Sequence, residues 1–129
     1  MVNEEDTTAP IKSFRSIINE SLEKHDNIHV IFHAGESTSR DNENLYDAIL
    51  MGTRRIGHGL AVINHPHLVE EIKRKGICIE LCPISNLILA YTLDLRWHPG
   101  KFLLQKGVPV SLSADDPGFW EIKGLTLDY

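Results

Sequence analysis

Residues 29–36 have the sequence HVIFHAGE, a short apolar run that ends in polar residues. The run is of strand length, and the glycine near its end is a residue that commonly terminates a strand. Three later stretches have the same form, with a short apolar run that leads into polar or glycine residues. They are RRIGHG (54–59), ICIELCP (77–83) and VPVSLSADDP (108–117). We therefore predict four strands, which begin near residues 29, 54, 77 and 108.

Helical patterns separate these strands. Apolar residues recur at helical spacing from Pro10 to about Lys24, and further helices are expected at 43–51, 66–75 and about 100–106. An alternation of strands and helices favours a parallel α/β sheet. The strands are nearly continuous apolar runs, which is expected when both faces of a sheet are covered.

The polar residues of the four runs all fall at the carboxyl ends of the predicted strands. This is the edge where (β/α)8 barrels and doubly wound sheets both build their active sites, so position alone leaves both folds open. Barrels usually need about 200 residues or more. The chain has 129 residues and four such units, half of a barrel, so we expect it to be a fragment of a larger fold.

The composition is that of an ordinary globular domain, with 42% hydrophobic and 24% charged residues. A net charge of -5 argues against nucleic acid as a partner. No apolar run approaches the roughly 20 residues of a membrane span, and the acidic start MVNEEDTTAP does not resemble an export signal. Cys78 and Cys82 lie four residues apart on one predicted strand, about 13 Å, so they cannot form a disulfide with each other.

Five strand-end residues have the chemistry of a metal-dependent hydrolase. Zinc binds imidazole nitrogen and carboxylate oxygen, and a catalytic zinc keeps a position for water. His33 and Asp115 are suitable ligands from two different strands, while Glu36 and His58 can move protons as the water attacks. Asp115 and Asp116 point in different directions because they are consecutive, so one can meet the metal and the other the substrate.

Other polar residues have simpler structural explanations. The sequence DDP by itself is most often a turn. His65 and His67 are expected to be a solvated helix start, and Glu80 is expected to be either a partner of the site or a structural buried acid. Ser85 and Asn86 follow the third strand, where a capping role for the next helix is favoured over a place in the pocket.

The motifs HAGE, RIGHG, CPISN and S-x-DDP, in this order and spacing, resemble the adenosine deaminases, which are metallo-dependent hydrolases, over about residues 29–129. The ending DDPGFWEIKGLTLDY, with ISN and DLRWHP, is most similar to the secreted adenosine deaminase-related growth factors, the adenosine deaminase 2 branch. This resemblance implies that residues 1–129 are a partial catalytic domain, the C-terminal half of a (β/α)8 barrel, with an acidic tail at 1–9. It also implies an extracellular protein.

The resemblance further implies zinc-dependent hydrolysis of adenosine or deoxyadenosine to inosine or deoxyinosine and ammonia, with one zinc ion per site. By matching motifs, His33 and Asp115 would ligate the zinc and Glu36 would donate a proton to the purine ring. His58 would orient and deprotonate the attacking water, and Asp116 would hydrogen-bond the purine. The implied partner is a purine nucleoside, and a homodimer is compatible with the resemblance.

Two alternatives remain open from the sequence. The family's first strand carries an H-x-H pair that supplies two further zinc ligands, whereas the H-x-H of this chain, His65 to His67, lies at a helix start. One alternative is therefore a truncated, catalytically inactive product with a binding or growth-factor-like role. The other is an AMP deaminase or another amidohydrolase, because S-x-DDP is shared more widely, although CPISN and KGLTLDY argue against it.

Overall fold

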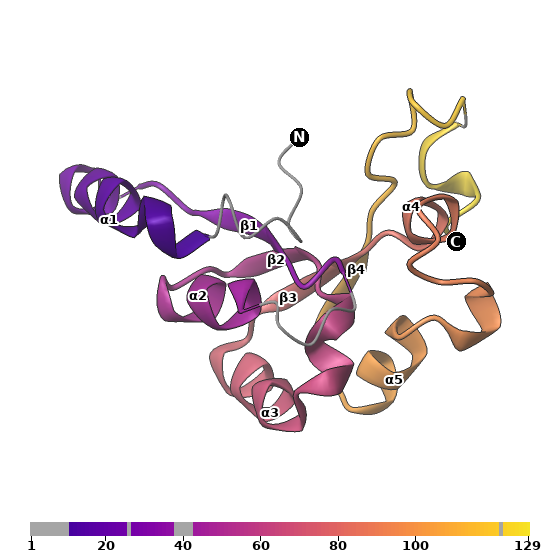
Figure 1. The fold of residues 1–129 in the computed structure, drawn as a ribbon, viewed down its shortest axis with the longest axis horizontal. Coiled ribbons are helices and arrows are strands. Elements are labelled where there is room, and N and C mark those ends of the chain that lie inside the picture. The colour runs from indigo at the N-terminus through magenta and orange to yellow at the C-terminus, as the bar shows by residue number, and fades with distance from the viewer. Residues whose placement is uncertain (1–10, 26, 38–42, 122) are drawn as a thin grey trace.

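The computed structural model describes residues 11–25, 27–37, 43–121 and 123–129, and its centre is one four-stranded sheet (Figure 1). The strands are β1 (Ile31–Ala34), β2 (Arg55–His58), β3 (Cys78–Leu81) and β4 (Val110–Leu112). They lie in the order β1-β2-β3-β4, and all three neighbouring pairs are parallel. The predicted parallel α/β sheet is confirmed, while the predicted acidic tail lies outside the described residues.

Within the described residues, five α-helices and four 3-10 turns accompany the strands. Helix α3 has the predicted bounds because a proline opens it and Gly76, in the left-handed conformation, ends it. The first predicted helix begins as a 3-10 turn, so its α-helical part is shorter than expected. The helices are α1 (Arg15–Lys24), α2 (Asn44–Leu50), α3 (Pro66–Lys75), α4 (Pro83–Ile88) and α5 (Gly100–Gln105), and the turns are η1 (Ile11–Phe14), η2 (Leu60–Asn64), η3 (Leu95–Trp97) and η4 (Gly124–Thr126).

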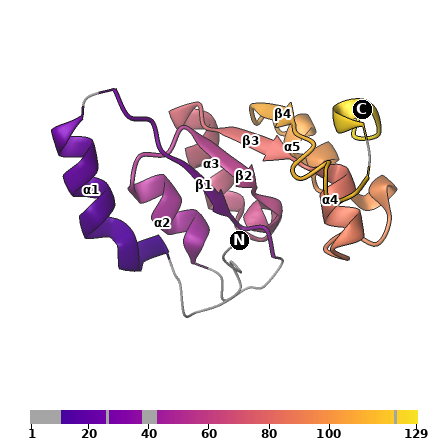
Figure 2. The ribbon, with the colours of Figure 1, turned by 90° about the horizontal axis from the view of Figure 1, so that it is seen from above.

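The hydrophobic core lies between one face of the sheet and the helices α2, α3 and α5 (Figures 1 and 2). Alternate strand residues point into it, because successive side chains of a strand lie on opposite faces. Helices α2, α3 and α5 each contribute apolar side chains to the same cluster. The largest fully buried apolar side chains are Leu45, Ile56, Leu60, Ile72, Ile77, Ile79 and Leu103.

The opposite face of the sheet carries no helix within the described ranges, which corrects the expectation that both faces are covered. Ile31 on this face is 51% exposed, and His33 and Arg55 are exposed as well. A doubly wound sheet has helices on both faces, whereas a barrel has them only on the outside. The one-sided arrangement is therefore that of a barrel segment, with the bare face corresponding to the barrel interior.

The register of the strands brings polar residues into one row on this bare face. His33 pairs with Gly57, Gly57 with Glu80, and Glu80 with Ser111. Because the strands are parallel, their carboxyl ends and the loops that follow lie at the same edge of the sheet. Within the described ranges, no helix has both the length and the apolar character that crossing a membrane requires.

Candidate metal and catalytic site

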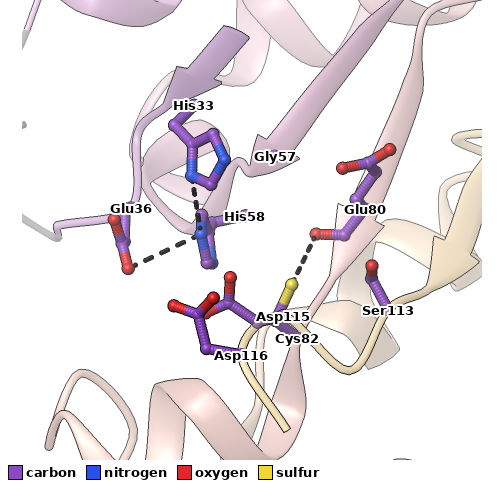
Figure 3. A pocket seen from close by; sticks show the side chains of 9 residues that line it. All are labelled: His33, Glu36, Gly57, His58, Glu80, Cys82, Ser113, Asp115 and Asp116. Atoms are coloured by element: carbon purple, nitrogen blue, oxygen red, sulfur yellow. Dashed lines mark hydrogen bonds and ion pairs between the residues drawn. The ribbon is translucent and has the colours of Figure 1, made fainter. Parts of the chain in front are cut away.

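All five residues that the sequence singled out line one pocket at the carboxyl edge of the sheet (Figure 3). The pocket has a volume of about 490 Å³, within the usual range for small-molecule sites. Its lining comes from the ends of all four strands and the loops that follow them. The lining residues are His33, Glu36, Gly57, His58, Glu80, Cys82, Ser113, Asp115 and Asp116.

The backbone after β1 turns sharply at Gly35, and this turn brings Glu36 to the pocket. Gly35 has a φ of 65°, and a Cβ atom there would lie 2.7 Å from the Cγ and Cδ1 atoms of Leu45. The carbonyl oxygens of Ala34 and Gly35 accept hydrogen bonds from the amides of Gly59 (3.1 Å) and Ala61 (2.8 Å). The loops after β1 and β2 are thus bonded to each other, which fixes the relative positions of the groups they carry.

His58 is the most deeply buried member of the site, with 1% of its surface exposed. Its Nε2 atom lies 3.1 Å from His33 Nδ1 and 3.6 Å from Glu36 Oε1. Burial lowers the pKa of His58 to about 4, although the charge of Asp115 opposes this shift. The ring is therefore neutral at pH 7, and its contact with Glu36 at that pH involves a neutral imidazole.

His33, Glu36 and His58 form a group that can hold a metal ion. Each offers one ligand atom, and the three atoms all lie within 4.8 Å of one another. Imidazole nitrogen and carboxylate oxygen are the ligand types that zinc takes in catalytic sites. The sequence paired His33 with Asp115 instead. The structure places Asp115 in the same pocket but outside this three-residue group.

Asp115 and Asp116 follow β4 and lie beneath His58 in the view of Figure 3. Asp115 has a φ of 57°, a left-handed conformation that aspartate adopts more readily than most residues. Its Oδ2 atom accepts a hydrogen bond of 2.6 Å from the hydroxyl of Ser85. The backbone carbonyl of Asp116 accepts a hydrogen bond from Phe119, which closes the turn through Pro117.

Ser85 and Asn86 have a different place from the helix cap that the sequence favoured. Both lie within α4, and Cys82 occupies the capping position without a side-chain cap bond. Ser85 binds Asp115, and the Asn86 Nδ2 atom lies 3.4 Å from His58 Nδ1. The capping prediction was wrong because the segment after β3 is itself a helix. The signal in the sequence was the pair of polar residues inside the apolar stretch PISNLI.

Glu80 and Cys82 complete the wall of the pocket that β3 provides. Glu80 Oε1 accepts a hydrogen bond of 2.7 Å from Arg55 Nε, and the other end of that guanidinium donates to Ser111 at 3.1 Å. Glu80 is half-buried and ion-paired with Arg55, so it is not a structural buried acid, and it lines the pocket itself. Cys78 and Cys82 are both free thiols, as their spacing predicted.

His65 and His67 lie away from this pocket, beside α2. The Tyr46 hydroxyl is 3.0 Å from His65 Nδ1 and 2.8 Å from His67 Nε2. His65 is only partly exposed, and its Nε2 atom is buried without a hydrogen-bond partner. The expectation of a solvated helix start is confirmed for His67, which is exposed in the first turn of α3, and is wrong for His65, which is half-buried against α2.

Comparison with known proteins shows which family the sequence resembles. The family model described as adenosine deaminase matches residues 2–129. An adenosine deaminase from Lutzomyia longipalpis is 46% identical over 132 residues, which cover 100% of this chain and 25% of that protein. Adenosine deaminase 2 from Dictyostelium discoideum is 51% identical over 98 residues, 76% of this chain and 18% of that protein. The chain thus spans about a quarter of the length of the curated relatives that it matches in full.

Solved structures show the same fold. An adenine deaminase from Arthrobacter aurescens superposes with a TM-score of 0.78 at 23% identity, over 91% of this chain and 35% of that one. An amidohydrolase from Burkholderia ambifaria with bound Zn has a TM-score of 0.78 at 21% identity, over 95% of this chain and 34% of that one. These structures show the likeness of the fold alone, and the family is shown by the family model and the relatives. The chain belongs to the adenosine deaminase family, within which its relatives include the adenosine deaminase 2 branch.

Proposed function

We propose that this chain provides catalytic residues of a zinc-dependent hydrolase that converts adenosine and deoxyadenosine to inosine and deoxyinosine, with release of ammonia. The observation that carries the proposal is the convergence of His33, Glu36, His58, Asp115 and Asp116 on one pocket. The names of the relatives support it, since those from Lutzomyia longipalpis and Dictyostelium discoideum are adenosine deaminases.

The donor set of the pocket fits zinc. His33 offers imidazole nitrogen and Asp115 offers carboxylate oxygen, and we propose that these two residues hold the ion. One side-chain ligand atom each of Glu36 and His58 lies within 4.8 Å of a ligand atom of His33, so both side chains border the same part of the pocket. A bound zinc ion supplies Lewis acidity, which lowers the pKa of water and so provides a nucleophile near neutral pH.

We propose for the remaining residues the roles that the resemblance implies, and their places in the pocket support these roles. Glu36 is poised beside His58 and, when protonated, can donate its proton to a purine ring nitrogen. The neutral imidazole of His58 can orient a water molecule by a hydrogen bond at Nε2, the nitrogen that faces Glu36 and His33. Asp116 is available to hydrogen-bond the purine. Ser85 holds the carboxylate of Asp115 in place.

Replacement of Glu36 by Gln tests the proposal directly. The amide keeps the shape of the side chain but cannot deliver a proton, so we expect at least about a hundredfold loss of turnover. Zinc content should remain unchanged. The matched control is Glu70→Gln on α3, where the carboxylate is exposed and pairs with Lys73.

The assay follows the ultraviolet absorbance change as adenosine becomes inosine, in the chain as printed and in the longest product of the same gene. Deoxyadenosine and AMP are compared in parallel, because preferential turnover of AMP would favour an AMP deaminase. Zinc binding without turnover of any of the three by either product would contradict the proposed function.

A non-catalytic binding role is the second candidate. The observation that favours it is the bare sheet face, which leaves His33 exposed at one side of the pocket. The deamination assay and a nucleoside-binding measurement distinguish the two functions. Binding of nucleoside without turnover would support the non-catalytic role. We further propose, from the resemblance to the adenosine deaminase 2 branch, secretion and a homodimer, which detection in culture medium and light scattering would test.

A further inference from the structure

A row of buried polar groups leads from His58 away from the pocket. Its members are His58 at the end of β2, Asn86 in α4 and His98 just before α5, which are 1%, 0% and 8% exposed. The Nδ1 atom of His58 lies 3.4 Å from Asn86 Nδ2, and Asn86 Oδ1 lies 3.1 Å from His98 Nε2. The amide of Gly100 donates to His98 Nδ1 at 3.0 Å. Asn86 and His98 are absent from the lining of the pocket.

The direction of every bond in this row follows from its last member. The Gly100 amide is a backbone N–H and can only donate, so His98 Nδ1 must be an acceptor. A neutral His98 therefore carries its proton on Nε2 and donates it to Asn86 Oδ1. Burial lowers the pKa of His98, which favours the neutral ring.

The orientation of the Asn86 amide then sets the state of His58. With Oδ1 occupied by His98, the Asn86 NH₂ group faces His58 Nδ1, and this nitrogen must accept. The proton of a neutral His58 is consequently on Nε2, the nitrogen that faces His33 and Glu36. If every bond in the row ran in the opposite direction, His98 would carry its proton on Nδ1. That N–H would then face the N–H of Gly100 at 3.0 Å, with no acceptor between them.

We propose that Asn86 and His98 are positioning residues that fix the tautomer of His58, so that its proton is held on Nε2 and directed into the pocket. Neither residue contacts the pocket, and both act through the His58 ring. The inference deepens the proposed function, because His58 belongs to the proposed catalytic set. It also changes the role expected from the sequence, since His58 in this state presents a hydrogen-bond donor to the pocket and can orient a water molecule at Nε2 but cannot take a proton there.

The tautomers can be measured without metal or substrate. Long-range ¹H–¹⁵N correlation spectra of the ¹⁵N-labelled, metal-free full chain distinguish the protonated from the unprotonated nitrogen of each ring, and single substitutions assign the signals. At pH 7.5 we expect both His58 and His98 to carry the proton on Nε2. The ratio of tautomers at His58 should be at least about tenfold, because the reversed row leaves buried donors without acceptors. A His58 that is protonated at Nδ1, or an even mixture, would overturn the inference.

Variants of His98 test whether the row is the cause. In His98→Gln the amide can still accept from Gly100 and donate to Asn86, so we expect the His58 tautomer to be preserved. In His98→Leu both bonds are lost, and the preference of His58 should fall at least about tenfold. An unchanged His58 tautomer in folded His98→Leu protein would show that the row does not set it.

Substitution of Asn86 by Asp gives the opposite change. A carboxylate accepts at both oxygens, so His58 should move its proton to Nδ1 while His98 stays protonated on Nε2. The matched control is Asn44→Asp, which alters another buried asparagine and should leave the His58 signals unchanged. If Asn86→Asp does not fold, the wild-type spectrum and the spectra of His98→Gln and His98→Leu still test the inference. If the wild-type protein shows the expected His58 tautomer but no deaminase activity, the result contradicts the proposed function and leaves the inference about the tautomer standing.

Discussion

His58 and Asp115 share a left-handed backbone conformation that residues other than glycine seldom adopt. Their φ angles are 68° and 57°, and only Ala90 and Glu121 share the left-handed region among the other described non-glycine residues. Such conformations are unfavourable by on the order of 1 kcal/mol or more and concentrate at functional sites. In this protein they direct an imidazole at the end of β2 and a carboxylate in the loop after β4 into the same pocket.

The hydroxyl of Ser85 should affect metal binding through Asp115. Its removal in Ser85→Ala takes away the 2.6 Å hydrogen bond that orients the carboxylate. Partners of metal ligands commonly contribute about 10- to 100-fold to metal affinity, so we expect a loss in that range, measured by competition with a chromogenic chelator. Ser111→Ala is the matched control, since Ser111 contacts Arg55 and should leave zinc affinity nearly unchanged.

The two cysteines should differ in reactivity. Burial, aided by the charge of Asp115, raises the pKa of the Cys82 thiol to about 12, and the side chain is 3% exposed. Because the thiolate is the nucleophile, iodoacetamide at pH 8 should modify the partly exposed Cys78 well before Cys82. Peptide mass spectrometry after timed quenching measures both rates. Similar rates are expected only in urea, and their appearance in the native protein would contradict the burial of Cys82.

At the scale of elements, the strength of local signals determined which helices could be predicted. Helix α3 has a proline at its first position and Gly76 at its end, and the sequence predicted both boundaries. Helix α4 is not predicted by the sequence, whereas the equally short α5 is, because Gly107 marks the end of α5 and no glycine directly follows α4. Without α4, the contacts of Ser85 and Asn86 could not be predicted, because the direction of a side chain depends on the helix or strand that carries it.

The turn after β1 should be sensitive to the loss of its glycine. In Gly35→Ala the left-handed backbone is disfavoured by about 1–2 kcal/mol, and the added Cβ would also meet Leu45 at 2.7 Å. Gly76→Ala has the same φ of 65° but open space around the Cβ, so it shows the backbone effect alone. Urea unfolding should give a larger loss of the free energy of unfolding for Gly35→Ala. Equal losses would mean that Leu45 moves aside.

At the scale of the whole molecule, stability should decrease as the pH falls below neutrality. The pKa of His58 is about 4 in the folded chain against 6.5 for an ordinary histidine, and burial lowers the pKa of His98 in the same direction. Between these values the unfolded chain binds a proton that the folded chain does not, so acid favours unfolding. At about 1.4 kcal/mol per pKa unit, His58 contributes a loss on the order of 3 kcal/mol between pH 7 and pH 4.

Urea unfolding of the metal-free chain across this pH range measures the effect. His58→Gln removes the titrating ring, so the variant should show a flatter decline between pH 6.5 and pH 4. A variant with the same slope as the wild type would indicate that other groups produce the acid sensitivity.

The sequence by itself determined the alternation of strands and helices, their parallel order and the strand ends that carry polar residues. These features depend on local patterns, such as the apolar run before His33 or the glycines around His58, and each is complete within a few residues. The candidate site residues were identifiable for the same reason. Residue type and position at a strand end indicate chemistry before any contact is known.

Only the tertiary structure decided which face of the sheet the helices cover and which side chains meet. Ser85 reaches Asp115 across 30 residues of sequence, and Asn86 reaches His58 across 28. Tyr46 contacts His65 and His67 in the same way, from a different helix. Such pairs depend on strand register and on how helices pack against the sheet, which are set by burial of the whole core and have no local signal in the chain.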